Sequence, residues 1–522
     1  MTSLERLIGA VGAKFSWGEH AEVITVSKTS RTAGAAYERI RNAVDYEEEH
    51  LLRRNAIRRI VMRRVQAMDK QHTTRGEALL TELIWAKYLP NKQVPPSMIG
   101  TIDAILERYD RLFQAIPADG DRQAYEEWLF DVLSTEIEYT LEPPKADEAL
   151  ASFMFERVKR ELVWEADKLE ASEQDMLLYG AIYRALLKSN PATLRYRMLT
   201  LYFPHWSRAT ESQVEEVAGR LSALVRAIES HIQHPLADQL YRRLRRYVLV
   251  FWTIKDIIKE HPEGATEIFK NEEKLTKMVK RVAEARYDRF RTRRTRTVAR
   301  AVLFLFLTKM LLALIIEVPY EYFFLEHIAL GALAINILFH PIFLSVIGMT
   351  VRIPQKRNTD QLIKFVGAVL GDKDPALNIV FKIKKPWTQG FLGQFFTIIY
   401  TLTYLFSYGV IAWFLSSALN FNVVSVALFL FFFSLVTFFG IKIRQSVQEL
   451  LVVERQGSVI GTLFDFFLLP IVRAGRWISL RARKLNVFAF FLDYIAEAPI
   501  KLGIEMVESW TAFVKAQKEE LE

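Results

Sequence analysis

The chain has 522 residues, of which 69 are Lys or Arg and 60 are Asp or Glu, so its formal net charge is +9. Hydrophobic residues make up 51% of it and charged residues 25%, which excludes an intrinsically disordered chain. Cysteine is absent, and this excludes disulfides, thiolate nucleophiles and cysteine-ligated metal centres. Residues 1–298 are rich in charge, whereas residues 299–450 contain long apolar runs. The sequence therefore predicts an integral membrane protein that carries a large soluble domain.

The N-terminal half predicts helices throughout, with almost no strand signals. Residues 1–35 contain no apolar core of the signal-peptide kind, and we expect a flexible segment there. Residues 36–263 predict a soluble helical domain, because apolar residues recur at helical spacing and prolines divide the segments. Its clearest helix follows a capping box at 212–215 and carries an apolar stripe from Val214 to Ile232.

The second half predicts an all-α membrane region. A basic juxtamembrane helix is expected over 264–298, and a transmembrane region over 299–441. Each of its four apolar segments is about 20 residues long or more, as a membrane-spanning helix requires. The expected spans are about 299–319, 324–350, 391–418 and 422–441.

The connections between these spans predict how the chain is oriented. The first connection is expected to be a short loop that carries Glu317, Glu321 and Glu326 but no Lys or Arg. The middle loop, 351–390, is strongly basic, whereas the last connection is only the turn 420–422. Because basic loops stay on the cytoplasmic side, we expect the soluble domain, the middle loop and both termini to be cytoplasmic. The expected location is the cell membrane, as in the inner membrane of a prokaryote.

Residues 442–522 are expected to form amphipathic helices at the membrane interface. The apolar run 457–472 is interrupted by Asp465 and Pro470, and arginines follow it, so we expect it to lie on the membrane without crossing. A last helix is predicted near the C-terminus, because acidic residues and Lys501 recur there at steps of three or four residues.

No motif for catalysis, cofactor binding or metal binding is found in the sequence. Phosphate-binding glycine loops, zinc-protease motifs, nucleophile elbows and calcium-binding loops are all missing. His231 and His234 are three residues apart, but without further ligands nearby two solvated histidines explain them better than a metal site. We therefore expect no cofactor and no metal, and we favour a non-enzyme over an enzyme.

Lys309 is the most unusual residue, because it lies midway along the first predicted span. A lysine there costs about 2.5–3.5 kcal/mol of insertion free energy, so compensation by polar groups is expected. The predicted intramembrane polar cluster consists of Lys309, Asn336, His340, Thr397, Thr401 and Tyr404. These groups can line an ion or proton pathway, or they can simply form hydrogen bonds between helices.

The basic run before the first span has two interpretations, nucleic-acid binding and contact with lipid head groups. Basic residues beside a span are attracted to anionic lipids and also determine topology, and no nucleic-acid-binding pattern accompanies them. We therefore expect anionic lipid as a partner and no nucleic acid. The predicted head-group contacts are Arg289, Arg291, Arg293, Arg294, Arg296 and Arg300.

Two functions remain open from the sequence. The first is a membrane-anchored scaffold or adaptor whose cytoplasmic helical domain binds protein partners or a second copy of the chain. The alternative is a small ion, proton or solute transporter that the soluble domain regulates. A membrane-embedded enzyme ranks third, because the sequence supplies no recognisable acid–base cluster.

Overall fold

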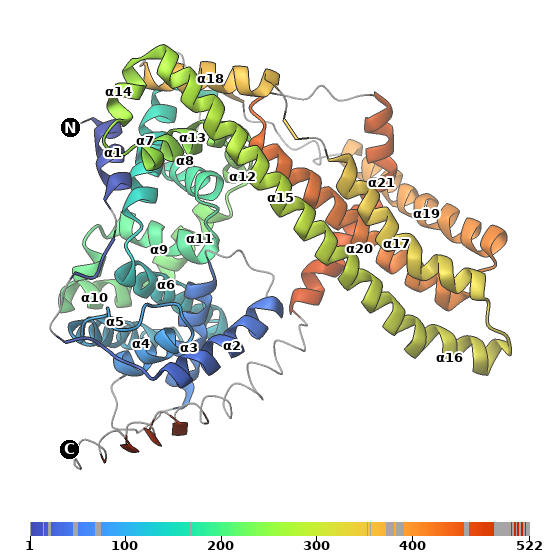
Figure 1. Ribbon diagram of the computed structural model, residues 1–522, viewed down its shortest axis with the longest axis horizontal. Helices are drawn as coiled ribbons and strands as arrows, with labels where there is room; N and C mark the ends of the chain where they lie inside the picture. Colours follow the sequence, from blue (N-terminus) through green and yellow to red (C-terminus); the bar gives the residue numbers. More distant parts are fainter. Residues whose placement is uncertain are drawn as a thin grey trace. The chain divides into compact units, whose positions relative to one another are not determined.

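The computed structural model describes residues 2–13, 15–18, 22–44, 51–67, 75–118, 120–165, 169–351, 353–354, 356–371, 380–382, 391–453, 459–484 and single positions between 503 and 517. It is predominantly helical, as the sequence predicts. The contacts between Cα atoms divide the chain into two compact units (Figure 1). The first comprises Met1–Lys159, Lys168–Leu244 and Asn486–Glu522, and the second Arg160–Asp167 and Arg245–Leu485. Each unit is described by itself below.

The first unit is a stack of amphipathic helices around an apolar core. Leu80, Leu83, Ile102 and Trp206 are among its most deeply buried side chains. Its helices are α1 (Ser3–Gly12), α2 (Lys28–Val44), α3 (Leu52–Ala67), α4 (Arg75–Trp85), α5 (Ser97–Gln114), α6 (Arg122–Leu141), α7 (Lys145–Glu161, whose last residues fall in the second unit), α8 (Ala171–Leu186), α9 (Pro191–Tyr202), the 3-10 turn η2 (Trp206–Arg208), α10 (Glu211–Gly219), α11 (Leu221–Ile232) and α12 (Pro235–Leu244).

The segment 1–35, expected to be flexible, contains helical structure. Thr2 and Glu5 form a capping box that begins α1, and Leu7 is completely buried. Further along, the amide of Val26 donates to Asn91 Oδ1 at 3.1 Å, and Asn91 Nδ2 donates back to the carbonyl of Val26 at 3.0 Å. These two hydrogen bonds to a side chain far away in the sequence hold Val26 in place, and local sequence patterns do not reveal such a contact.

The helix expected from a capping box at 212–215 begins two residues earlier. The capping residue is Thr210, whose partner is Gln213, so the same kind of motif occurs in another register. The apolar stripe is also divided, because α10 ends at Gly219 and α11 begins at Leu221. Val214, Val217, Leu221, Leu224 and Ile228 are nevertheless buried, as the stripe predicts.

The second unit contains the apolar helices. Its elements are β1 (Val163–Glu165), α13 (Val248–Glu260), α14 (Ala265–Lys270), α15 (Glu272–Leu312), the π-helical segment η3 (Ala313–Glu317), α16 (Val318–Tyr320), the π-helical segment η4 (Glu321–Leu325), α17 (Leu330–Thr350), α18 (Lys356–Leu370), β2 (Val380–Lys382), α19 (Phe391–Leu419), α20 (Val423–Val447), the 3-10 turn η5 (Gln448–Leu450) and α21 (Val459–Lys484). The two short strands pair in parallel, with Val163 opposite Val380.

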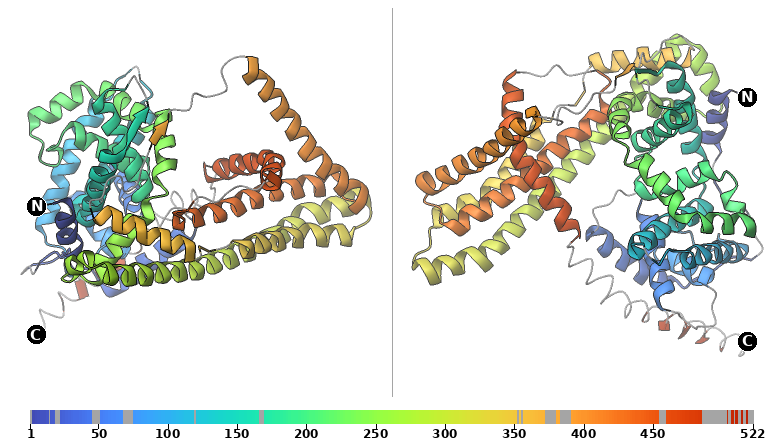
Figure 2. Two further views of the ribbon diagram at one scale, coloured as in Figure 1. Left: turned by 90° about the horizontal axis from the view of Figure 1, so that it is seen from above. Right: turned by 180° about the vertical axis from the view of Figure 1, so that it is seen from behind.

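Four helices of this unit are long and apolar enough to cross a membrane, which agrees with the four predicted spans. They are Glu272–Leu325, Leu330–Thr350, Thr397–Leu419 and Val423–Leu450. The first is unexpectedly long, because the basic segment and the first apolar segment form one continuous helix of 54 residues. Figures 1 and 2 show α15, α17 and α20 side by side, and many apolar side chains on these helices are exposed, as lipid-facing positions would be.

The soluble domain was expected to end at 263, but the first compact unit ends at Leu244. The difference is α13, whose side chains Phe251, Ile254 and Ile257 are completely buried. This helix packs against α15 and α18 of the second unit. An apolar run of this length predicts a buried helix but does not show which segment buries it.

The apolar face of α18 lies against protein. Leu362 and Val366 are fully buried, and the helix contacts α13 and α15. Asn358 lies inside the first turn of this helix and joins three segments. It donates to the hydroxyl of Tyr287 at 2.9 Å and to the carbonyl of Leu450 at 2.8 Å, and it accepts from the amide of Val452 at 2.8 Å.

The apolar run 457–472, expected to lie on the membrane surface, belongs to α21 from residue 459 onward. This helix packs across α20 and α19 (Figure 2). A Cβ atom at Gly475 would come within 2.0 Å of the carbonyl oxygen of Ser434, so only glycine permits this contact. The acidic and basic face predicted for the last helix lies outside the described residues.

Candidate functional site: a polar cluster among the apolar helices

Lys309 and two glutamates lie on the same face of the first apolar helix. An α-helix turns about 100° per residue, which would place Glu317 roughly 80° around the axis from Lys309. A π-helix turns only about 80° per residue, and the π-helical segment Ala313–Glu317 removes most of that offset. Both Glu317 and Glu321 are 1% exposed. The π-helical turns therefore direct two carboxylates into the helix bundle.

Asn336 of α17 connects Lys309 with Glu317. Lys309 Nζ donates to Asn336 Oδ1 at 2.5 Å. Asn336 Nδ2 donates to both carboxylate oxygens of Glu317, at 2.9 and 3.0 Å. The oxygen of this side-chain amide thus accepts from the positive ammonium group, and its nitrogen donates to the negative carboxylate.

Residues of α20 complete this network. Ser425 Oγ donates to Glu317 Oε1, and the carbonyl oxygen of Ser425 lies 3.4 Å from Asn336 Nδ2. The ammonium group of Lys309 also lies 4.7 Å from the ring centre of Phe432, a distance suited to a cation–π contact. The charged groups are consequently enclosed by three helices, α15, α17 and α20.

Glu321 links the start of α17 to the start of α20, at the end of the bundle that lies away from the basic segment. One of its oxygens accepts from the amide of Ala329 at 2.9 Å, and the other accepts from Asn422 Nδ2 at 2.7 Å. Asn422 also begins α20, because its Oδ1 accepts from the amide of Ser425 at 2.9 Å. Glu321 therefore ties the first connection to the turn at 420–422.

His340 lies beside Asn336, one turn further along α17. Its Nδ1 is 3.2 Å from the carbonyl oxygen of Asn336, and its Nε2 is 3.0 Å from that of Phe429. A neutral imidazole carries one N–H and can donate to only one of these carbonyls, whereas a protonated imidazole can donate to both. The ring is completely buried and lies edge-on to the ring of Phe429.

The predicted cluster is thus brought together in part. Lys309 and His340 both form hydrogen bonds with Asn336. Thr397, Thr401 and Tyr404 form hydrogen bonds within α19 instead. Thr401 donates to the carbonyl of Thr397, and Tyr404 accepts from the hydroxyl of Tyr400. Tyr408, the next in this row, bonds with Ser434 of α20 at 2.7 Å.

The loop expected to carry Glu317, Glu321 and Glu326 is the clearest correction to the sequence analysis. The helix continues through Glu317 and Glu321 as far as Leu325, and only Glu326 lies beyond it, with a left-handed backbone. The sequence contained a usable signal, because 309, 317 and 321 are separated by multiples of four residues. Ser425 and Asn422 were also missed as partners of these carboxylates, since a serine and an asparagine near a helix end suggest only a cap.

The six predicted head-group arginines all lie on α15, in varied surroundings. Arg289 pairs with Asp256 at 3.6 Å and Arg291 with Asp288 at 2.8 Å. Arg294 is half-buried and donates to the carbonyl of Val351 at 2.7 Å. Arg293, Arg296 and Arg300 are exposed.

The arrangement pairs buried charges with hydrogen-bonding partners. Lys309 is 3% exposed, and Asn336, His340 and Ser425 are completely buried. Within the described part of the chain, no group of three or more acidic or histidine side chains could hold a metal ion. The chemistry available is proton transfer among Lys309, Glu317 and His340, or attraction between opposite charges that holds the helices together.

Comparison with models of protein families, with curated proteins and with solved structures finds no match to this chain.

Proposed function

We propose that the protein is a membrane-anchored scaffold or adaptor. Its second unit anchors the chain in a membrane, and its first unit presents helical surfaces to protein partners or to a second copy of the chain. The observation that carries this proposal is the enclosed network of Lys309, Asn336 and Glu317. Its opposite charges are bridged and buried, as expected of groups that fasten helices together.

The first unit supports the same proposal, because it is large and has its own apolar core. Inside it, Glu136 accepts from Arg108 at 2.9 Å, from the hydroxyl of Tyr109 at 2.7 Å and from Trp206 Nε1 at 2.9 Å. Burial raises the pKa of the Glu136 carboxyl, and the charge of Arg108 opposes that shift. Such a network fixes the relative positions of α5, α6 and η2, and a rigid surface suits recognition of partners.

A transporter is the second candidate, favoured by one observation. Lys309, Glu317 and His340 are three ionisable groups within candidate membrane helices, and intramembrane ionisable groups often belong to ion or proton pathways. The adaptor ranks first because each of these groups has a hydrogen-bonding partner inside the bundle.

We expect the first unit to determine which proteins associate with the membrane. The fragment 1–244 and the full chain should capture the same partners, the full chain from mild detergent and the fragment from the soluble fraction. Expressed alone, the fragment should move those partners out of the membrane fraction. Partners that are captured only by residues 245–522 would contradict the adaptor proposal.

We also propose that the protein lies in the cell membrane, such as the inner membrane of a prokaryote, with both termini cytoplasmic. The basic segment 272–300 and the basic loop 351–390 support this orientation. A topology reporter after Glu522 or within 372–376 should give a cytoplasmic signal, and one at Asn420 an external signal. An external signal from 372–376 would refute this topology. Contact with anionic lipids, rather than with nucleic acid, is the accompanying proposal for the arginines of α15.

A further inference from the structure

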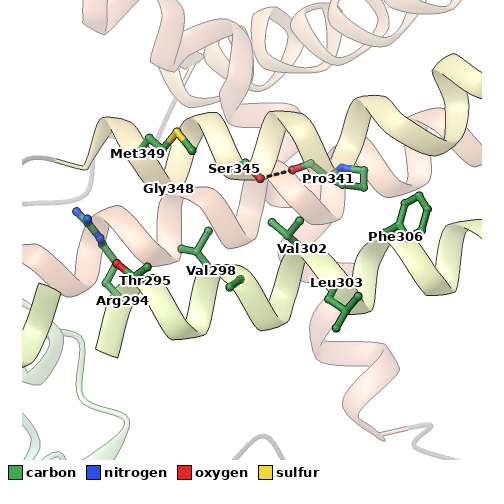
Figure 3. Close-up of a pocket in the computed structure, with 11 residues that line it drawn as sticks. Arg294, Thr295, Val298, Val302, Leu303, Phe306, Pro341, Ser345, Gly348 and Met349 are labelled. Carbon is green, nitrogen blue, oxygen red and sulfur yellow. Dashed lines mark hydrogen bonds between the residues drawn. The ribbon is translucent and has the colours of Figure 1, made fainter. Parts of the chain in front are cut away.

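An open groove lies between α15 and α17, on the part of the bundle that follows the basic segment (Figure 3). It has a volume of about 580 Å³, within the range of roughly 300–1,000 Å³ that is typical of small-molecule sites. Val298, Val302, Leu303 and Phe306 line one wall, and Pro341 and Met349 belong to the other. The groove is thus strongly apolar along its length.

One end of the groove carries a positive charge. Figure 3 shows Arg294 at that end and Phe306 with Pro341 at the other. The guanidinium of Arg294 donates to the carbonyl of Val351 at 2.7 Å, which fixes its position at the end of α17. A guanidinium has five N–H groups, so one such bond leaves donors for an anion.

Close packing of the two helices forms the floor of the groove. A Cβ atom at Gly348 would lie 2.8 Å from Val298 Cγ1, so glycine is what allows α17 to approach α15 here. The hydroxyl of Ser345 donates to the carbonyl of Pro341 at 2.9 Å, so it is satisfied within its own helix. The groove therefore offers a positive charge at one end, where Thr295 also lines it, and its other lining residues are apolar apart from Ser345.

The length and polarity of this groove match one phospholipid chain. Twelve residues separate Arg294 from Phe306, which is roughly 18 Å along an α-helix. One leaflet contributes about half of the ~30 Å hydrocarbon core of a bilayer. A lipid whose phosphate meets Arg294 can therefore place an acyl chain along the whole groove.

We propose that this groove binds one anionic phospholipid, with its phosphate on Arg294 and an acyl chain between α15 and α17. Head-group attraction places the lipid in the leaflet on the Arg294 side of the bundle. This site is independent of the choice between adaptor and transporter.

Binding is measured on the full chain in mild detergent by native mass spectrometry. The probes are phosphatidylglycerol and phosphatidylcholine with identical acyl chains. The wild-type chain should prefer phosphatidylglycerol by about five-fold, as one basic group at a membrane surface implies. The Arg294→Gln variant should lose that preference. The control variant Lys442→Gln removes one positive charge from an exposed position of α20 outside the groove and should keep it.

A second pair of variants tests the acyl-chain part of the site. Ala299→Phe fills the groove and should displace both lipids, whereas Ala427→Phe, on an exposed position of α20, should displace neither. If Ala299→Phe does not fold, Leu303→Trp on the same wall provides the same test. Equal losses of phosphatidylglycerol from Arg294→Gln and Lys442→Gln would overturn the proposal, since they would indicate diffuse surface attraction. Unchanged lipid binding after the groove is filled would also overturn it.

Discussion

Replacement of Lys309 by methionine should destabilise the membrane region by about 3 kcal/mol, because it leaves the buried charge of Glu317 without its counter-charge. Glu317→Gln should have an effect of similar size, since it leaves the ammonium group of Lys309 uncompensated. The free energy of unfolding is measured in mixed micelles by titration with denaturing detergent. In both variants the remaining partners, Asn336 and Ser425, cannot supply the missing charge.

The double variant Lys309→Met/Glu317→Gln provides the decisive comparison. With both charges removed, the bundle should regain stability to within about 1 kcal/mol of the wild type, because buried ion pairs are often replaceable by neutral groups. Lys442→Met removes an exposed lysine of α20 and should change little. A double variant whose loss equals the sum of the two single losses would show that the two charges are not coupled.

In the first unit, Glu136→Gln should lower the free energy of unfolding by about 2–3 kcal/mol. The carboxylate accepts from Arg108, Tyr109 and Trp206, and the neutral amide leaves the guanidinium of Arg108, whose side chain is 9% exposed, without a counter-charge. Urea denaturation of the fragment 1–244, followed by circular dichroism and by tryptophan fluorescence, measures the change.

Glu127→Gln serves as the matched control, because Glu127 lies on the same helix and is exposed. Its effect should stay within about 0.5 kcal/mol. A fragment that is recovered only as an aggregate, or equal effects from the two substitutions, would count against a first unit that folds around Glu136.

Several features of the fold could be predicted because they depend on short stretches of sequence. The four candidate membrane helices follow from the lengths of their apolar runs. The turn at 420–422 also follows from local chemistry, since Asn420 adopts a left-handed backbone and Asn422 caps α20. Lys309, Asn336 and His340 could be placed together because a charge inside a membrane helix requires polar partners, and 336 and 340 share a helix face.

The features that sequence reasoning missed depend on contacts between distant segments. Glu317 and Glu321 suggest a polar loop when they are viewed alone, and only the π-helical turns with Asn336 and Asn422 make them buried helical residues. An amphipathic pattern likewise cannot distinguish a membrane surface from a protein surface. The apolar face of α18, for example, packs on α13 and α15, although its composition would suit a membrane surface equally well.

Proton flux through reconstituted vesicles tests the central claim most directly, namely that the cluster of Lys309, Asn336 and Glu317 fastens the helices of a membrane anchor. The wild-type chain and the double variant Lys309→Met/Glu317→Gln are reconstituted at equal density. A pH-sensitive dye enclosed in the vesicles reports proton flux under an imposed pH gradient and membrane potential. We predict that neither protein gives flux above that of empty vesicles. Flux through the wild-type chain that disappears in the double variant, while that variant remains folded, would contradict the account and establish a proton pathway.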